Sequence, residues 1–319
     1  MTSNDSFQLE IWKGDWGLPS VDVDCLKVLT YAKFSNIPLN VKATNNPFKS
    51  PNGKLPILRY MNNKFYTVDK ILEVFQEHKY TLDNGITRIQ NAEASAFNTM
   101  LDECIEPAIQ QMCWIDQLNL NQVIRPWYAK ALPFPLNFYY PGKYEKYAKS
   151  MIEALYPTKD DKAAEASVYS KAQKCINTLS TRLGESEFFF GSTPTTFDVL
   201  VFSYLAPLLK IPLPNCALQN HLKACPNLVK FITRISQKYF EDDYQEYEKT
   251  KSKEQEKKTK SNSLEDFPNK RRNQILAGMF AAVAMMTYAF STGIVQVLIY
   301  LISRRKFLRL QKGERKRSR

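Results

Sequence analysis

The chain has 319 residues, with 44 Lys and Arg against 32 Asp and Glu, and a formal net charge of +12. This length is sufficient for one large or two ordinary domains, and 10 Gly with 17 Pro exclude a collagen-like or linker-dominated chain. The charge is unevenly placed: residues 270–319 hold 12 basic residues and one acid, whereas residues 1–269 hold 32 basic and 31 acidic residues. Because the body is almost neutral, the nucleic-acid partner that +12 would suggest is not expected.

Residues 1–82 predict a small α+β domain that begins with a strand and a helix. Apolar and polar residues alternate over residues 7–11, which is the pattern of a half-buried strand. The helix that follows is expected to be capped by Ser20 and to place Asp22 and Asp24 in its first turn, where the helix dipole favours negative charge. Its apolar face is predicted to consist of Val21, Cys25, Val28, Leu29 and Ala32.

A hairpin is predicted after the second strand, which covers residues 39–43. The runs KLPILRY and KFYTV are two strands joined across Asn62 and Asn63 in hairpin fashion. Pro56 lies inside the first of these runs, where a proline forfeits a ladder hydrogen bond. We therefore expect Pro56 at a sheet edge or in a cis peptide at a turn.

A second helix completes this domain. Asp69 is expected to cap it, and its apolar face would carry Ile71, Leu72, Phe75 and His78. The predicted element order is β-α-β-β-β-α, or β-α-β-α-β-β-α if residues 44–53 contain a helical turn.

Residues 83–240 predict an all-helical domain. Its first helix begins at about Ile86 and carries Pro107, which is expected to kink it. Thr195 and Asp198 form a T-x-x-D capping box before an apolar run, so a buried helix is expected from about Thr195. The segment between the first two helices is rich in proline and aromatic residues and is expected to be irregular and packed on the surface. It covers residues 125–142, and further helices are predicted at 144–156, 160–183 and 228–239.

A charged linker at residues 241–274 precedes an uncharged segment, residues 275–302, and a basic tail, residues 303–319. As a helix, these 28 uncharged residues would extend ~42 Å, against ~30 Å of bilayer hydrocarbon. We expect a transmembrane helix in preference to a buried core helix. Only 17 residues follow it, which is the layout of a tail-anchored protein with its bulk in the cytosol. The basic residues that flank the segment suit lipid head groups: Lys270, Arg271, Arg272, Arg304, Arg305 and Lys306.

Cysteine and histidine provide no sign of a metal centre. The six cysteines contain no CxxC pair, and the two histidines, His78 and His221, are isolated in the sequence. With a cytosolic body, free thiols are favoured over disulfides or metal ligands. Cys25 falls on the apolar face of the first helix and is expected in the core, because a reactive thiol needs an electropositive and partly exposed setting.

The order of elements resembles the glutathione-transferase architecture, in which a thioredoxin-like domain precedes an all-helical domain. KLPIL resembles the cis-proline strand of that superfamily. Four further motifs resemble the metaxin family, in particular its tail-anchored first subtype. They are WGLPSVDVDCLKVLTYAKF at 16–34, RPWYAKALPFPLNF at 125–138, FFFG at 188–191 and RRNQIL at 271–276.

The resemblance implies a non-enzymatic role on the mitochondrial outer membrane, facing the cytosol. Metaxins belong to the sorting and assembly machinery that inserts β-barrel precursors. The implied partners are a second metaxin, the barrel core subunit and the precursors themselves. The resemblance also implies roles in mitochondrial contact-site assemblies and in linking mitochondria to transport motors, which would make the chain a motor adaptor.

A membrane-tethered, glutathione-dependent transferase is the alternative function. In that superfamily a hydroxyl or thiol early in the first helix stabilises the glutathione thiolate, and Ser20 is the nearest candidate here. An acid-Ser pair binds the γ-glutamyl group, but this chain has Asp69 followed by Lys70. Together with Pro56, these residues are candidates for a vestigial glutathione site. No catalytic residue, metal or cofactor is expected, and the scaffold function is favoured because a fold alone does not carry an activity.

One aromatic run is a candidate surface for partner proteins. Protein interfaces are enriched in aromatic residues, but the same side chains could pack beneath a long loop. The candidates are Trp127, Tyr128, Phe134, Phe138, Tyr139 and Tyr140.

Overall fold

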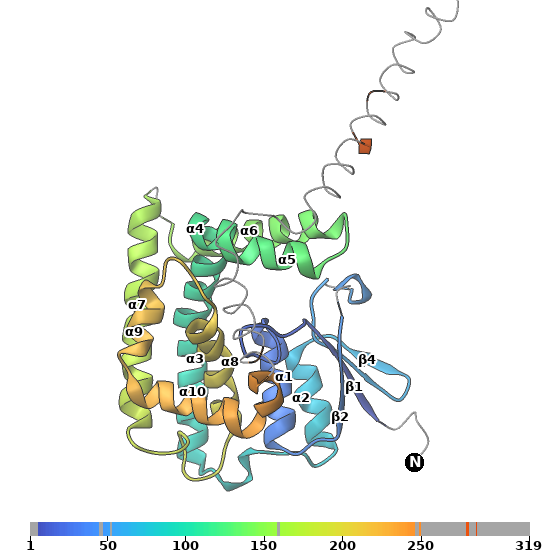
Figure 1. Cartoon of the computed structure of the whole chain (residues 1–319). Helices are drawn as coiled ribbons and strands as arrows, with labels where there is room; N and C mark the ends of the chain where they lie inside the picture. Colours follow the sequence, from blue (N-terminus) through green and yellow to red (C-terminus); the bar gives the residue numbers. More distant parts are fainter. Residues whose placement is uncertain are drawn as a thin grey trace, which may run out of the picture. The chain divides into compact units, whose positions relative to one another are not determined.

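A four-stranded sheet in the order β2-β1-β3-β4 forms the N-terminal part of the computed structural model (Figure 1). The structure describes residues 6–44, 47–51, 53–157, 160–245, 249, 279–280 and 285. Strand β1 pairs in parallel with β2 and antiparallel with β3, and β3 forms an antiparallel hairpin with β4. The strands are β1 Phe7–Ile11, β2 Leu39–Ala43, β3 Ile57–Tyr60 and β4 Asn63–Phe65.

Two helices pack between this sheet and the helical part of the chain: α1 Val23–Phe34 and α2 Val68–Glu77 (Figure 1). In β1 the apolar residues Phe7, Leu9 and Ile11 are buried, as their alternation predicts. Strand β2 is an edge strand with four exposed residues. The connection from β1 through α1 to β2 is the crossover that joins parallel strands.

The predicted order β-α-β-β-β-α is confirmed, with one addition. The loop before β3 contains a single 3-10 turn, Pro47–Lys49, which is the helical turn that the alternative order allowed for. The Leu55–Pro56 peptide is cis, as expected. The predicted position of the hairpin turn is wrong by one residue. Tyr60 pairs with Asn63, so the chain turns at Met61 and Asn62. Met61 adopts a positive φ of 51°.

Both predicted helix caps in this part are wrong. Helix α1 is capped by Asp22, whose carboxylate accepts a hydrogen bond from the Cys25 N–H at 3.0 Å. Ser20 lies two residues further out, and Asp22 itself has the extended backbone that is typical of an N-cap residue. Helix α2 follows Thr67, and Asp69 is its second residue. Asp69 therefore adds charge to the first turn without capping it.

The rest of the described body is helical, as predicted. Helix α8 is its central element: it contacts α1, α3, α9 and α10, and it is buried over most of its surface (Figure 1). The capping box of Thr195 and Asp198 is present at its start. The helices are α3 Arg88–Gln110, α4 Gln117–Asn119, α5 Arg125–Ala131, α6 Leu136–Leu155, α7 Asp161–Leu183, α8 Thr196–Lys210, α9 Ala217–Lys223 and α10 Pro226–Tyr239.

Helix α3 remains continuous through Pro107 and then changes to a π-helical turn, Gln111–Ile115. A proline inside a helix removes one backbone hydrogen bond, and π-helical turns occur mostly as local insertions near functional sites. The irregularity predicted at Pro107 therefore lies one turn later. It directs the buried side chains of Met112, Cys113 and Trp114 into the body of the protein.

The prediction that residues 125–142 form an irregular segment is wrong. Helix α5 covers its first part, and α6 begins at Leu136 with Pro141 inside it. Tyr140, Ala148 and Ile152 are buried on one face of α6. Packing of this face outweighs the poor helix propensity of a Pro- and Tyr-rich sequence, since tertiary contacts supply most helical stability.

Residues 1–254 and 255–319 form two separate units. No helix of the described residues is both long and apolar enough to cross a membrane. Except for residues 279, 280 and 285, the predicted membrane segment 275–302 lies outside the described residues, as do its basic flanks and the tail 303–319.

Candidate functional site

The structure does not assemble a glutathione site around Ser20. This side chain is wholly buried, and its Oγ accepts a hydrogen bond from the Asp22 N–H at 3.4 Å. A hydroxyl in that position supports the turn that leads into α1. It has no exposed surface from which to contact a thiolate.

Of the other three candidates, the structure brings two together. Pro56 and Asp69 line one surface groove, together with Thr67 and Asp102. Lys70 does not line this groove: its Nζ lies 2.7 Å from Glu73 Oε2 in an exposed ion pair along α2. Lys70, which stands where the superfamily has a serine, therefore forms an ion pair on the helix surface and does not enter the groove.

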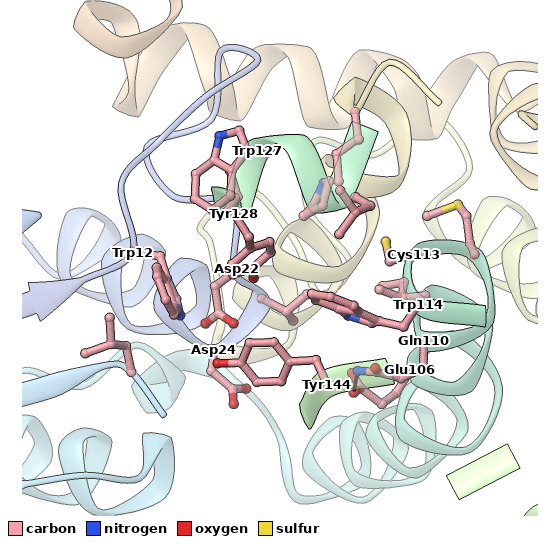
Figure 2. Close-up of a pocket in the computed structure, with 18 of the residues that line it drawn as sticks. Trp12, Asp22, Asp24, Glu106, Gln110, Cys113, Trp114, Trp127, Tyr128 and Tyr144 are labelled. Atoms are coloured by element: carbon pink, nitrogen blue, oxygen red, sulfur yellow. Dashed lines mark hydrogen bonds between the residues drawn. The ribbon is translucent and has the colours of Figure 1, made fainter. Parts of the chain in front are cut away.

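A different cavity, of about 140 Å³, lies where the start of α1, the end of α3, α5 and α6 meet (Figure 2). Its walls combine aromatic rings with three carboxyl groups. No sequence motif marks this cavity, because its residues come from at least four elements that are far apart in the chain. The residues that define it here are Trp12, Asp22, Asp24, Glu106, Gln110, Trp114, Trp127, Tyr128 and Tyr144.

The rings of this cavity form one connected aromatic cluster. Tyr128 lies at its centre, with its ring centroid 5.4 Å from Trp12, 5.2 Å from Trp114 and 5.8 Å from Tyr144. Trp114 and Tyr144 are themselves 5.1 Å apart. These separations lie in the range of favourable aromatic pairs, so the rings stabilise one another.

Hydrogen bonds fix the elements that carry these rings. The indole N–H of Trp127 on α5 donates to Asp15 Oδ2 at 2.9 Å in the loop after β1. The buried Asn119 donates from its amide to the Met112 carbonyl at 3.1 Å, and its own carbonyl accepts from the Asn215 N–H at 2.8 Å. The π-helical turn is therefore tied to the loop that follows α8.

The carboxyl groups of the cavity are held in an environment that opposes their ionisation. Burial, followed by the nearby charge of Asp24, raises the pKa of Asp22 to about 7. Burial also raises the pKa of Glu106, although a hydrogen bond from Gln110 to its Oε1 at 2.9 Å acts in the opposite direction. The negative charge of Asp24 is partly compensated, because Lys27 Nζ lies 3.3 Å from its Oδ1.

The thiols near the cavity are unsuited to nucleophilic chemistry. Cys25 is fully buried, as predicted, and burial raises its pKa well above the usual value. Burial likewise raises the pKa of Cys113 to about 12. Both thiols therefore stay protonated at neutral pH, whereas a reactive cysteine needs a lowered pKa. Within the described part of the chain, no group of three or more His, Cys, Asp or Glu side chains could hold a metal ion.

The six aromatic candidates for a partner surface divide into two sets. Tyr140 is wholly buried, Tyr128 is 8% exposed, and Trp127 packs against the core. Phe134, Phe138 and Tyr139 are 75%, 73% and 55% exposed. Only the second set lies on the surface, around the start of α6.

Two family models match this chain. Residues 25–145 match a model described as an outer mitochondrial membrane transport complex protein. Residues 172–235 match the glutathione S-transferase C-terminal domain. Among solved structures, a glutathione transferase from Phanerochaete chrysosporium, GSTFuA3, matches with a TM-score of 0.49 at 12% identity, over 73% of this chain and 97% of that one.

The curated relatives cover more of the chain. Metaxin-1 of Mus musculus is 39% identical over 91% of both chains. Metaxin-3 of Xenopus laevis is 39% identical over 74% of this chain and 77% of that protein. Identity at this level along nearly the whole length shows that the chain belongs to the metaxin family.

Proposed function

We propose that this chain is a non-enzymatic subunit of the mitochondrial outer-membrane sorting and assembly machinery. In this role its body faces the cytosol, where it binds partner subunits and helps to pass β-barrel precursors to the barrel core subunit. The observation that carries the proposal is the relationship to metaxin-1 over 91% of the chain. The match of residues 25–145 to an outer mitochondrial membrane transport family supports it.

The local chemistry favours a scaffold over a transferase. Ser20 is buried, Lys70 is paired on the surface, and the thiols of Cys25 and Cys113 have raised pKa values. Of the four glutathione-site candidates, only Pro56 and Asp69 line one groove, and Ser20 does not line it. Glutathione chemistry is therefore not the proposed activity.

The exposed side chains of Phe134, Phe138 and Tyr139 are the proposed contact surface for a partner subunit. Large aromatic side chains are costly to leave in water and are enriched at protein interfaces. The rings of Phe134 and Phe138 also lie 6.2 Å apart in an edge-to-face arrangement, which presents them as one apolar surface.

Attachment to the membrane is proposed to depend on residues 275–302. This uncharged segment is long enough to cross the hydrocarbon core, and basic residues flank it on both sides. The mitochondrial outer membrane is the proposed location, in agreement with the family description for residues 25–145.

Affinity purification of the full chain after gentle detergent extraction tests this function. A second metaxin and a barrel core subunit are expected to co-purify. A double substitution, Phe134→Ala with Phe138→Ala, is expected to reduce their recovery at least several-fold. Ile89→Ala provides the matched control, because Ile89 is 82% exposed at the start of α3, on a different helix. Recovery of motor adaptors alone would contradict the assembly role and indicate a transport function.

A further inference from the structure

The cavity around Tyr128 combines a wall of carboxyl groups with an aromatic wall. In the described residues, neither Asp22 nor Glu106 forms an ion pair. Lys27 is already bound to Asp24 and donates to the Tyr204 hydroxyl at 3.0 Å. Lys54 lines the cavity, but its Nζ lies 4.9 Å from the centre of the Tyr147 ring.

We propose that this cavity binds a guanidinium group, carried by a small guanidino compound or by an arginine side chain. The proposal goes beyond the role in the assembly machinery and does not depend on it. Three features of the cavity support it: its size, its ring faces and its hydrogen-bond acceptors.

The size of the cavity limits the ligand to a small group. A cavity of about 140 Å³ is close to the ~150 Å³ that accommodates a benzene molecule in a protein interior. A planar guanidinium with a short alkyl stem fits this volume. A whole tripeptide such as glutathione does not.

The ring faces favour a delocalised cation. Tyr128, Trp114 and Tyr144 line the space from α5, the π-helical turn and α6, and their rings pack against one another (Figure 2). A cation within ~6 Å of such ring centres is attracted by their negative faces, and the attraction strengthens where water is excluded. Guanidinium stacks on aromatic faces and is more weakly hydrated than an ammonium ion, so it loses less on entering.

The acceptors favour a group with several N–H donors. Asp22 reaches the space from the N-cap of α1 and Glu106 from α3 (Figure 2). Although Tyr128 is only 8% exposed, its hydroxyl has no hydrogen-bond partner among the residues that the structure describes, and its side chain lines the cavity. This hydroxyl keeps access to the cavity and offers it a further hydrogen-bond acceptor. Guanidinium offers five donors in one plane and pairs strongly with carboxylates.

Other cations fit the cavity less well. The carboxyl groups do not meet in the arrangement that a metal ion requires, within the part of the chain that the structure describes. A quaternary ammonium would leave the acceptors without donors. A primary ammonium, as in lysine, is strongly hydrated and has no plane to stack on the rings.

The test uses the full chain in detergent and records tryptophan fluorescence and calorimetric heats during titration. Methylguanidinium and L-argininamide are expected to bind with saturation. L-lysinamide, tetramethylammonium and glutathione are expected to bind at least tenfold more weakly. An acetylated Gly-Arg-Gly amide peptide separates the two sources. If it binds more tightly than L-argininamide, the natural ligand is an arginine of a polypeptide; if it binds more weakly, the ligand is a free guanidino compound.

Neutral isosteres localise the binding. Asp22→Asn and Glu106→Gln are each expected to weaken L-argininamide binding at least tenfold, and Glu153→Gln on the exposed surface of α6 is expected to leave it unchanged. Asparagine also caps helices, so Asp22→Asn keeps the start of α1; Glu106→Gln tests the same site without touching a cap. Equal affinity for L-lysinamide and L-argininamide, or no saturable binding, overturns the proposal. Unchanged binding in both variants overturns it as well.

Discussion

The carboxylate of Asp198 accepts a hydrogen bond from the backbone N–H of Phe189 at 2.9 Å, across nine residues of sequence. Its other oxygen, Oδ2, accepts from the N–H and the hydroxyl of Thr195 at 2.9 and 2.6 Å. One buried side chain therefore joins the FFFG turn to the start of α8. Burial raises the pKa of Asp198, and these hydrogen bonds oppose the increase.

Asp198→Ala is expected to lower the free energy of unfolding by about 3 kcal/mol, because it leaves several buried donors without an acceptor. Urea unfolding of the full chain in detergent, followed by tryptophan fluorescence, measures the change. Thr87→Ala is the matched control: Thr87 and Gln90 form the same type of capping box on the exposed start of α3. Its loss should cost about 1 kcal/mol. Equal losses in the two variants would show that the link to Phe189 contributes nothing.

The full chain is expected not to bind immobilised glutathione and not to transfer its thiol. Ser20→Ala should change neither result, because Ser20 is wholly buried. Lys70→Ser restores the acid-Ser pair and should still give no binding, since Ser20 stays buried and cannot contact the glutathione thiol. A glutathione transferase run in parallel provides the positive control. Tight binding that is lost in Ser20→Ala would contradict the scaffold function and restore the transferase alternative.

Sequence patterns were sufficient where the signal is local. The strand at Phe7–Ile11, the capping box of Thr195 and Asp198, and the burial of Cys25 all follow from spacing within a few residues. The cap of α1 was misplaced because Ser20 and Asp22 both have a good capping side chain, and sequence alone does not show which of them keeps an extended backbone.

Two features depend on long-range packing and could not be predicted. Helix α6 runs through Pro141 because Tyr140 and Ile152 pack into the core, which local propensity does not reveal. The cavity joins Asp22 at the N-cap of α1, Glu106 on α3 and Tyr144 on α6, and no motif links these positions. The metaxin resemblance gave the family but did not indicate this site.

Replacement of Arg304, Arg305 and Lys306 with Gln is expected to shift the protein from mitochondria towards the endoplasmic reticulum. These residues follow the uncharged segment and would contact anionic head groups, and moderately apolar tail anchors with basic flanks resemble those of mitochondrial outer-membrane proteins. Fluorescence microscopy of the tagged full chain and membrane fractionation measure the distribution. The same change at residues 315–317, further along the tail, is the control. Unchanged targeting in the first variant would show that this basic flank does not direct the protein to mitochondria.

Asp22→Asn is expected to stabilise the protein at about pH 8 and to have almost no effect at about pH 3, where the carboxyl group is protonated in both the folded and the unfolded chain. The folded state holds the proton of Asp22 up to about pH 7, whereas the unfolded chain releases it near the ordinary value of 3.8. The wild-type fold is therefore penalised progressively as the pH rises between these two values, and the penalty is complete above the higher one. Asparagine cannot ionise, yet its side-chain oxygen can still accept from the Cys25 N–H. Thermal unfolding should show a melting temperature a few degrees above wild type at the higher pH. The exposed Glu153→Gln should show no such dependence. If Asp22→Asn is equally destabilising at both values, the carboxylate is needed as a charged cap and carries no burial penalty.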